Sequence, residues 1–411
     1  MVKEFLIKNG LHESCYDFDE HVKNFISEME KGLYGEGSSL RMLPSYLGVI
    51  PEKAPSGDVI AIDAGGTNLR IALVNFPAGG TPVVNRLEKH RIPGSQSEIS
   101  KNDFFKSIAD YIGDRTEISD KVGFCFSFPC TILPDREGKI IHFDKEVRVT
   151  DSEGAMIRAE LNAAFAGSGK PPVNVTVLND TAAALIGSVF SRGIKDMGGY
   201  IGLIYGTGIN ICYYDSEKHM LINTEAGGYN GFEKSVCDAE IDAESEAPGA
   251  QCYEKMASGA YFSKVVLKAA KLAAAQGLFS EKTGGLINAL TFINAPDIDA
   301  FLKENGSRDT ELGKLCDNES DKEVLYGILD GLYDRAAKLT AIAMTAVLIR
   351  SGATADHPAF LVAEGSTFRK GFRLQERFEN WIAAYSKEGR VYELMLADDH
   401  TVIGAAASVF L

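Results

Sequence analysis

The sequence lacks several patterns that mark common enzyme classes. It contains no G-x-x-x-x-G-K-[ST] stretch and no G-x-G-x-x-G leading into a helix, which disfavours a P-loop enzyme or a dinucleotide dehydrogenase. Its seven cysteines include no C-x-x-C pair, so they indicate reduced, mostly buried thiols and not a disulfide framework or a zinc site. There is no apolar run of membrane-spanning length and no signal-peptide pattern at the amino end. We therefore expect a cytoplasmic protein.

An excess of positive charge is missing as well. The formal net charge is −15, which argues against nucleic acid or an anionic membrane surface as a partner, because both require a basic face. An anionic nucleotide would have to be held by backbone N–H groups, a metal ion and a few local cations. With 411 residues, 45% of them apolar, the chain can bury large cores, and its length favours two domains or more.

Two short apolar runs around a glycine turn form the most informative stretch. Residues 59–62 and 69–74 are rich in β-branched side chains and flank the turn 65–68, the pattern of a hairpin in a buried sheet. The two glycines of the turn let the backbone approach a ligand, and turn N–H groups can cradle phosphate oxygens. Asp63 would repel phosphate unless a hydrated Mg²⁺ lay between them. Glycine turns of this kind are common and most bind nothing, so one alone indicates little.

The same design recurs about 140 residues further on. Two apolar strands within residues 200–214 flank Gly206, Thr207 and Gly208. A pair of such hairpins is typical of two similar lobes that grip the phosphates of a nucleotide from either side. The repeated design therefore indicates a nucleotide site.

An acidic residue follows a predicted strand at the place where α/β proteins bind ligands. Residues 173–178 form an apolar strand, and Asn179, Asp180 and Thr181 stand between it and the helical run 182–190. Asn or Asp at this position is the expected N-cap of the helix. A carboxylate at the carboxyl end of a strand also opens onto the crevice of an α/β sheet. Capping and catalysis are compatible, so both interpretations of Asp180 stay open.

Ser127 stands near the end of another predicted strand, residues 122–128, which Pro129 terminates. Its hydroxyl either faces a cleft or bonds to the backbone. The residues themselves favour neither interpretation.

Four further segments bear on the fold. The sequence predicts an amphipathic helix over 17–31 with Gly32 as its C′ residue, a surface loop over the acidic residues 238–248, a buried core helix over 324–349, and a strand over 358–363 that leads into a third glycine turn at 364–366.

Taken together, these motifs resemble those of the hexokinase family, the sugar kinases built on the actin-like ATPase fold. The resemblance is nearly end to end and rests on six short segments in order: Met42-Leu43-Pro44, residues 63–70, Phe126-Ser127-Phe128-Pro129, Asn179-Asp180-Thr181, residues 206–210, and P-G-A-Q-C-Y-E-K-M at 248–256. It implies an α/β protein with the two-lobed actin-like ATPase (ribonuclease H-like) fold and a cleft between a small and a large domain.

We expect four segments on this basis. Residues 1–57 would form an N-terminal helix and loop packed on the large domain, and 58–180 the small domain. Residues 181–396 would form the large domain, and 397–411 a C-terminal helix that returns to the small domain.

The resemblance also implies roles for individual residues. Asp180 would be the general base that takes the proton from the sugar 6-hydroxyl as that oxygen attacks the γ-phosphorus of ATP. The hexose hydroxyls would be held by Ser127, Lys145, Asn179, Asp180, Asn210, Glu225, Gln251 and Glu254. The nucleotide would be held by Asp63, Gly65, Gly66, Thr67, Asn68, Arg70, Gly206, Thr207, Gly208, Gly365 and Ser366, with Asp63 binding Mg²⁺ through water.

The sequence departs from the family pattern at Asp144, where the family has a sugar-contacting threonine, and at Glu364, where the family has aspartate. We predict an ATP- and Mg²⁺-dependent kinase of an aldohexose, with D-glucose as the first candidate, in which sugar binding draws the lobes together. The alternatives are a non-catalytic sugar sensor of the same fold, an actin-like or chaperone-like ATPase, and a kinase for fructose or mannose. The sequence leaves open whether the protein is a monomer or a homodimer.

Overall fold

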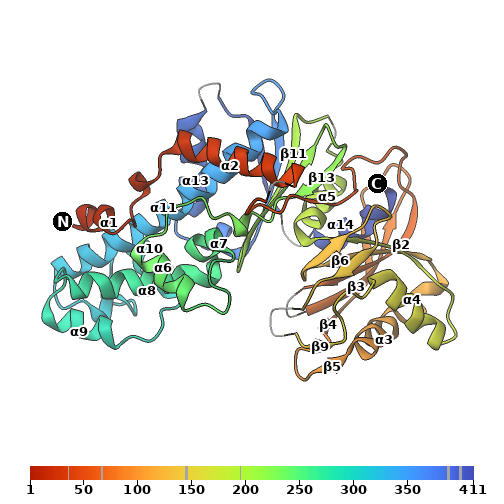
Figure 1. The fold of residues 1–411 in the computed structure, drawn as a ribbon, viewed down its shortest axis with the longest axis horizontal. Coiled ribbons are helices and arrows are strands. Elements are labelled where there is room, and N and C mark those ends of the chain that lie inside the picture. The colour runs from red at the N-terminus through yellow and green to blue at the C-terminus, as the bar shows by residue number, and fades with distance from the viewer. Residues whose placement is uncertain (36, 66–67, 144–146, 195, 387–388, 398–399) are drawn as a thin grey trace.

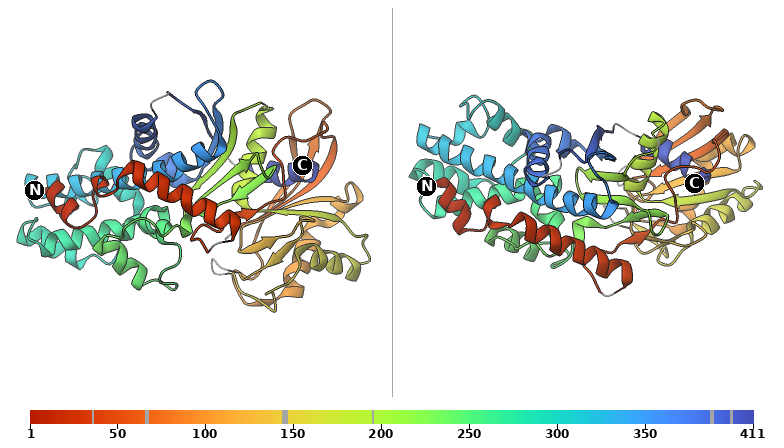
Figure 2. Two further views of the ribbon diagram at one scale, coloured as in Figure 1. Left: turned by 45° about the horizontal axis from the view of Figure 1, so that its top comes forward. Right: turned by 90° about the horizontal axis from the view of Figure 1, so that it is seen from above.

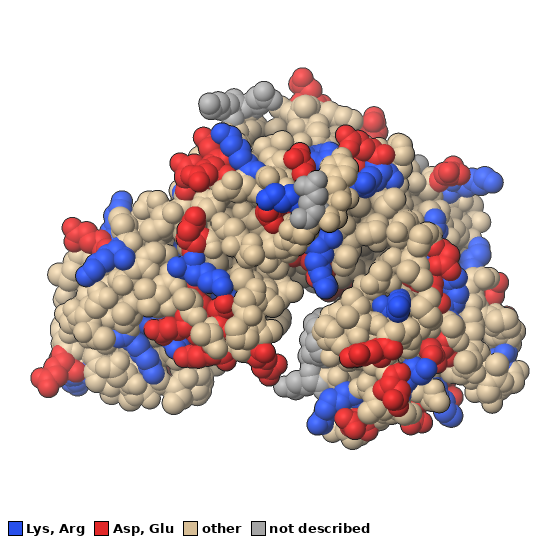
Figure 3. Space-filling model, viewed as in Figure 1, with Lys and Arg blue, Asp and Glu red and all other residues tan. Residues whose placement is uncertain are grey.

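The computed structural model describes residues 1–411 except 36, 66–67, 144–146, 195, 387–388 and 398–399. The chain forms two lobes, each built on a β-sheet flanked by helices (Figure 1). On the face drawn in Figure 3, the surface is hollowed between the lobes, and acidic and basic side chains are interspersed over both.

The smaller lobe contains a five-stranded sheet in the order β10-β6-β2-β3-β4. Its strands are β2 (Gly57–Ala64), β3 (Asn68–Phe76), β4 (Val83–Arg91), β6 (Lys121–Phe126) and β10 (Asn174–Leu178). β2 and β3 pair antiparallel, which confirms the first predicted hairpin, and β6 and β10 run parallel to β2. Parallel neighbours require crossover connections, and helices α3 (Lys101–Ile112) and α4 (Ile157–Gly167) lie in those connections and pack on each other.

The larger lobe contains a six-stranded sheet in the order β1-β13-β12-β11-β14-β15. Strands β11 (Gly199–Tyr205) and β12 (Ile209–Asp215) form the second predicted hairpin, and β13 (Met220–Asn223) continues it antiparallel. β14 (Ala359–Glu364) and β15 (Tyr392–Leu396) run parallel to β11, and β1 (Leu43–Pro44) pairs at the far edge. The carboxyl ends of β11 and β14 therefore meet at one edge of this sheet.

Two helices lie between the sheets and share one core with both. They are α5 (Asp180–Arg192) and α14 (Thr401–Ala407), which cross in close contact. A Cβ on Gly187 of α5 would lie 2.0 Å from the His400 carbonyl oxygen, and one on Gly404 would lie 1.8 Å from that of Ala183. The crossing is therefore possible only because both positions are glycine.

A long helix, α11 (Glu319–Ser351), forms the spine of the larger lobe and is buried on nearly every face in its second half, as predicted. Helix α2 (Phe18–Tyr34) runs along it, as all the views in Figures 1 and 2 show. Helix α1 (Val2–Lys8) packs on α11 as well. None of the described helices combines the length and the apolar composition needed to cross a bilayer.

The prediction of a surface loop over 238–248 is wrong. Helix α6 (Val236–Ala243) occupies the first part of this segment, and the side chain of Asp238 is buried. Asp238 forms a capping box with Ser235 and accepts hydrogen bonds from Arg335 of α11 at 2.7 and 3.1 Å. Because Arg335 is far away in sequence, the local acidic composition gave no sign that this carboxylate is paired in the core.

The predicted end of the first amphipathic helix is also wrong. Asp17 caps α2 by accepting from the amide of Glu20, but the helix continues past Gly32 and ends at Gly35, which has a left-handed φ of 76°. A Cβ on Gly32 would lie 2.3 Å from the carbonyl oxygen of Leu40. Gly32 is therefore required for close packing and not for helix termination.

Replacing Gly187 by alanine should lower the free energy of unfolding by about 1–3 kcal/mol, because the new methyl group overpacks the crossing of α5 and α14. The measurement is the shift of the urea midpoint followed by circular dichroism. Gly285→Ala is the matched control, since Gly285 lies within α9 (Glu281–Ala289) and a Cβ there meets nothing within 4 Å. Equal midpoints for the two variants would contradict the prediction.

Candidate functional site

Asp180 is the first residue of α5 and follows β10 after a single intervening residue. That residue, Asn179, provides the helix cap, because its side-chain oxygen accepts a hydrogen bond from the amide of Thr181 at 2.8 Å. The half-buried Asp180 carboxylate is therefore not used for capping. The capping role belongs to Asn179, and the catalytic role of Asp180 stays a prediction.

Asp63 of β2 and Asp180, which follows β10, lie near each other at the carboxyl ends of the two strands that flank β6. Between them is Cys125 of β6, which is aligned with Asp63 of β2 on one side and with Leu178 of β10 on the other. Burial raises the pKa of the Cys125 thiol well above its usual value, and the charges of Asp63 and Asp180 add to this effect. Both carboxylates can therefore face one ligand at the crevice where α/β sheets bind.

The carboxylate of Asp63 is buried and paired. Its cross-strand neighbour Arg70 donates from Nε at 2.7 Å and forms a second bond from Nη2. The hydroxyl of Thr401, at the start of α14, lies 3.4 Å from the same oxygen, Oδ2. The guanidinium compensates the buried charge, which would otherwise be strongly destabilising.

A hydrated Mg²⁺ ion fits this environment better than a directly coordinated metal. Within the described ranges, no group of three His, Cys, Asp or Glu side chains is placed to hold a metal ion. Mg²⁺ commonly keeps several waters and binds through one or two carboxylates together with substrate phosphates. Asp63 is the carboxylate that the sequence predicts for such an ion.

The second and third glycine turns lie against each other. Gly206 closes its turn by donating to the Gly208 carbonyl oxygen at 3.0 Å. Gly365 has φ 127°, and a Cβ on it would lie 2.2 Å from the Tyr205 carbonyl oxygen. Thr367 joins the two turns, because its hydroxyl donates to the Gly206 carbonyl oxygen at 2.9 Å. The structure thus brings the predicted nucleotide residues of the larger lobe to one sheet edge, Gly206, Thr207, Gly208, Gly365 and Ser366.

The amino end of α8 (Gly259–Ala275) supports these turns. The amide of Gly259 donates to the Gly206 carbonyl oxygen at 2.9 Å, and the amide of Ala260 donates to that of Thr207 at 3.1 Å. Ser258 separates α8 from the preceding short helix α7 (Cys252–Ala257). This break allows the first turn of α8 to bond the glycine turn.

A second group of predicted residues gathers on the larger lobe. Asn210 and Glu225 are connected through Asn223, which accepts from Asn210 Nδ2 at 2.8 Å and donates to Glu225 Oε1 at 2.7 Å. Glu254 accepts from the backbone amide of Ile209 at 3.1 Å. Gly208 and Gly227 make room for this group, because Cβ atoms there would lie 2.5 Å from Glu254 Oε2 and 2.8 Å from Gln251 Oε1, respectively.

The first glycine turn is described only at its ends. The amide of Gly65 donates to the Asn68 carbonyl oxygen at 3.0 Å, and the amide of Ser127 donates to that of Ala64 at 3.1 Å. Ser127 therefore lies beside this turn. The predicted residues Gly66, Thr67 and Lys145, like the departure at Asp144, lie outside the described residues.

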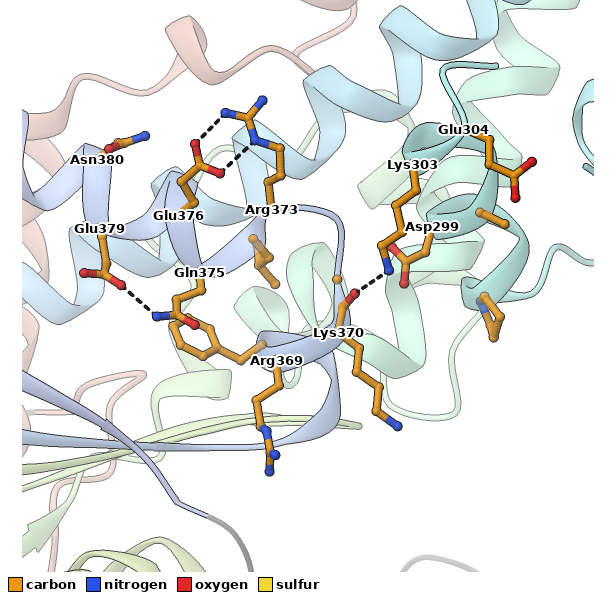
Figure 4. Close-up of a pocket in the computed structure, with 15 residues that line it drawn as sticks. Asp299, Lys303, Glu304, Arg369, Lys370, Arg373, Gln375, Glu376, Glu379 and Asn380 are labelled. Carbon is orange, nitrogen blue, oxygen red and sulfur yellow. Dashed lines mark hydrogen bonds and ion pairs between the residues drawn. The ribbon is translucent and has the colours of Figure 1, made fainter. Parts of the chain in front are cut away.

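Two hollows open on the larger lobe. One, of about 890 Å³, is lined in part by Gln251, Glu254 and Lys264, so it adjoins the second group of predicted residues. The other, of about 1080 Å³, lies among α10 (Ala295–Lys303), α12 (Ser366–Lys370) and α13 (Leu374–Tyr385) (Figure 4). Within its wall, Arg373 pairs with Glu376 and Gln375 donates to Glu379, and none of the predicted site residues lines it.

Sequence reasoning missed Thr181 and Asn223 as members of the site. Both are buried, and each bridges two predicted residues through hydrogen bonds. The available signal was weak: a polar residue directly beside Asp180, and one two positions before Glu225. The cysteine prediction is confirmed, since all seven are free thiols and most are buried.

Two family models, both described as hexokinase, match this chain over residues 7–190 and 200–411. The second alone covers more than half of the sequence. The chain belongs to the hexokinase family.

Curated relatives in this family include larger proteins. Hexokinase-1 of Rattus norvegicus is 31% identical over 430 residues, which cover 94% of this chain and 45% of that protein. Hexokinase-3 of Homo sapiens is 35% identical over 261 residues, 58% of this chain and 27% of that protein. Hexokinase-2 of Saccharomyces cerevisiae is 27% identical, and the match covers 87% of this chain and 80% of that protein. The chain thus spans less than half of the mammalian relatives that it matches.

Solved structures confirm the predicted fold class. The hexokinase from Schistosoma mansoni, complexed with glucose, superposes with a TM-score of 0.79 at 24% identity and covers 100% of this chain and 98% of that one. A ROK hexokinase from Thermus thermophilus matches with a TM-score of 0.51 at 15% identity, and the match covers 85% of this chain and 97% of that one. The chain has the two-lobed actin-like ATPase fold of these hexokinases.

The loop that carries the family's Met-Leu-Pro segment is fastened by Glu28 of α2. Glu28 accepts hydrogen bonds from Lys31 and Ser38 at 2.8 Å and from the amide of Ser39 at 3.1 Å. The backbone of Ser39 in turn lies against Gly228, three residues after Glu225. Burial opposes ionisation of Glu28, but these hydrogen bonds outweigh it and lower its pKa to about 2 from 4.5.

We expect Glu28→Gln to destabilise the protein by about 1–3 kcal/mol at pH 7. Because the folded-state pKa is depressed, the carboxylate contributes stability above pH 4.5, and this is lost as the pH falls toward 2. The gap between wild type and variant in urea unfolding should therefore shrink below about pH 4. Glu30→Gln, at an exposed position of the same helix, is the control. A gap that is independent of pH would contradict the expectation.

Proposed function

We propose that this protein is an ATP-dependent hexokinase that transfers the γ-phosphoryl group of ATP to the 6-hydroxyl of an aldohexose. The observation that carries the proposal is the position of Asp180. Its carboxylate does not cap α5, and it lies at a strand end near Asp63. The chain also matches hexokinase models over both of its halves. D-Glucose is the first candidate substrate, because a solved structure of the same fold is a glucose complex.

Asp180 is suited to act as the general base. Thr181 donates to its Oδ1 at 3.2 Å, which restrains the carboxylate while leaving Oδ2 as the oxygen that receives a proton. A base in hydrogen-bond reach of the attacking hydroxyl removes its proton as the new bond to phosphorus forms. The proton from the sugar 6-hydroxyl would thus reside on Asp180 in the product complex.

The hexose would lie against the polar residues of the two lobes. Ser127, Lys145, Asn179, Asn210, Glu225, Gln251 and Glu254 are the proposed ligands of its hydroxyls. A ring of carboxylates and amides can read each hydroxyl, and an epimer that mispairs leaves buried polar groups unsatisfied. Asp144 stands where the family has a sugar-contacting threonine, so fructose and mannose are the alternative substrates to test against glucose.

The nucleotide would lie across the glycine turns. Gly65, Gly66, Thr67, Gly206 and Thr207 would cradle its phosphates through N–H groups and hydroxyls, with the amides of Gly65 and Gly206 closing their own turns. Asp63 would orient the water shell of Mg²⁺. When bound, the Mg²⁺ ion neutralises charge that develops on the phosphates during transfer. Gly365 and Ser366 would pack near the adenosine. The Arg70 guanidinium is proposed to stay with Asp63.

Closure of the two lobes would exclude water from the reaction. The proposed sugar ligands come from both sides, Ser127 from the smaller lobe and Glu225 and Glu254 from the larger one. Sugar binding should therefore draw the lobes together and remove water as an acceptor of the phosphoryl group.

Asp180→Asn should lower kcat by about 10²- to 10⁴-fold, the usual contribution of a general base. The affinity for hexose, measured by calorimetry, should change little because asparagine keeps the shape of the side chain and can still accept from Thr181. The assay couples sugar phosphate formation to a reporter enzyme. A turnover number near that of wild type would remove Asp180 from the role.

ADP formation should be slow with ATP and Mg²⁺ alone and rise at least about 10²-fold on addition of glucose, because closure assembles the site only around the sugar. A panel of glucose, mannose and fructose identifies the accepted hexoses. Hexose binding without ADP formation would favour the sugar sensor. ADP release that is equal with and without sugar would favour a protein-directed ATPase.

A further inference from the structure

We infer that Thr181 and Asn223 are positioning residues that join the general base and the sugar-binding carboxylate into one hydrogen-bonded chain. The chain runs Asp180–Thr181–Asn210–Asn223–Glu225, with contacts of 3.2, 3.0, 2.8 and 2.7 Å. It begins at the amino end of α5 and crosses β12 to the end of β13. The inference rests on the proposed function, because it gives these residues a role in that reaction.

The hydrogen bond between Thr181 and Asp180 has only one possible direction. The Asn210 Nδ2 group is a donor, so the Thr181 hydroxyl accepts from it at 3.0 Å. An ionised carboxylate is only an acceptor, so the single proton of the hydroxyl points to Asp180 Oδ1. Thr181 is fully buried, and it is the one hydrogen-bond partner of the Asp180 side chain in the part of the protein that the structure describes. Its hydroxyl therefore selects the orientation of the carboxylate.

Asn210 is saturated by partners within the protein. Its Oδ1 accepts from the backbone amides of Ile211 at 2.8 Å and Ala226 at 3.2 Å, which fixes which way the amide points. Its two Nδ2 protons go to Thr181 and Asn223. An amide offers two donors and two acceptor lone pairs, so a sugar hydroxyl that binds Asn210 has to replace one of these partners. Thr181 and Asn223 consequently set the geometry of Asn210.

Asn223 performs the corresponding task for Glu225. It is buried, it donates to Glu225 Oε1, and its Oδ1 accepts from the Glu225 amide at 3.4 Å. Glu225 has a positive φ of 55°, an unusual conformation for a residue with a side chain. The bonds from Asn223 to both its backbone and its side chain stabilise this conformation. Loss of Asn223 should therefore loosen the carboxylate that meets the sugar and leave Asp180 in place.

Substitutions at the two residues should affect different constants, kcat for Thr181 and the glucose dissociation constant for Asn223. Thr181→Val keeps the size of the side chain and removes its hydroxyl, so kcat should fall by about 10- to 100-fold, the effect of losing a hydrogen bond to a charged group. The dissociation constant for glucose should change by less than about threefold. Thr181→Ser restores the hydroxyl and should recover most of the lost kcat. Asn223→Leu should instead raise the glucose dissociation constant by about 10- to 100-fold with a smaller effect on kcat.

Thr345→Val is the matched control. Thr345 is a buried threonine of α11 whose hydroxyl has no hydrogen-bond partner among the described residues, so its replacement should leave both constants unchanged.

Wild type is assayed first, and absence of ADP formation that depends on glucose, mannose or fructose would overturn the proposed function itself. With an active wild type, a normal kcat for Thr181→Val, or no recovery in Thr181→Ser, overturns the inference alone. If circular dichroism shows that Thr181→Val does not fold, the glucose affinity of Asn223→Leu decides: an unchanged value overturns the inference.

Discussion

The close crossing of α5 and α14 is the constraint on which the rest of the structure depends. Three glycines allow it: Gly187 and Gly404 in the helices, and Gly123 in β6, where a Cβ would lie 1.7 Å from the Ala405 carbonyl oxygen. At such distances any side chain collides with backbone, which cannot move aside as a flexible side chain can. The two sheets thereby share one core, whose apolar residues come from both lobes. Relative movement of the lobes has to preserve these contacts.

The same crossing fixes the amino end of α5, where the proposed general base lies. The helix begins at Asp180, next to the strand ends of the small sheet, and its first turn lies against the large sheet, where a Cβ on Gly202 would lie 3.0 Å from the Thr181 carbonyl oxygen. A side chain at this position is held by both lobes at once. Rigid support of this kind is what a general base requires, because small displacements from the attacking oxygen are costly.

Features with local causes could be predicted from the sequence. The two hairpins follow from short β-branched runs around glycine turns, and Asp180 follows from a strand that leads directly into a helix. Features with distant causes could not. The burial of Asp238 depends on Arg335, and the roles of Thr181 and Asn223 depend on Asn210, on a different strand. Glycine is ambiguous in a sequence, because Gly32 and Gly187 permit close packing while Gly35 permits a left-handed turn.

The candidate site concentrates carboxylates in a protein with a net charge of −15, although one of its two proposed substrates, ATP, is itself an anion. In the structure each of these acids accepts a hydrogen bond from a donor within the protein: Arg70 for Asp63, Thr181 for Asp180, Asn223 for Glu225 and the amide of Ile209 for Glu254. Only the first of these donors is a cation. Among these four donors, the cation belongs to Asp63, which lies just before the first predicted phosphate turn, and the donors named for the proposed sugar-binding acids are neutral. A neutral donor such as Thr181 can hold the Asp180 carboxylate in position without cancelling a negative charge, which suits the proposed removal of a proton from a hydroxyl.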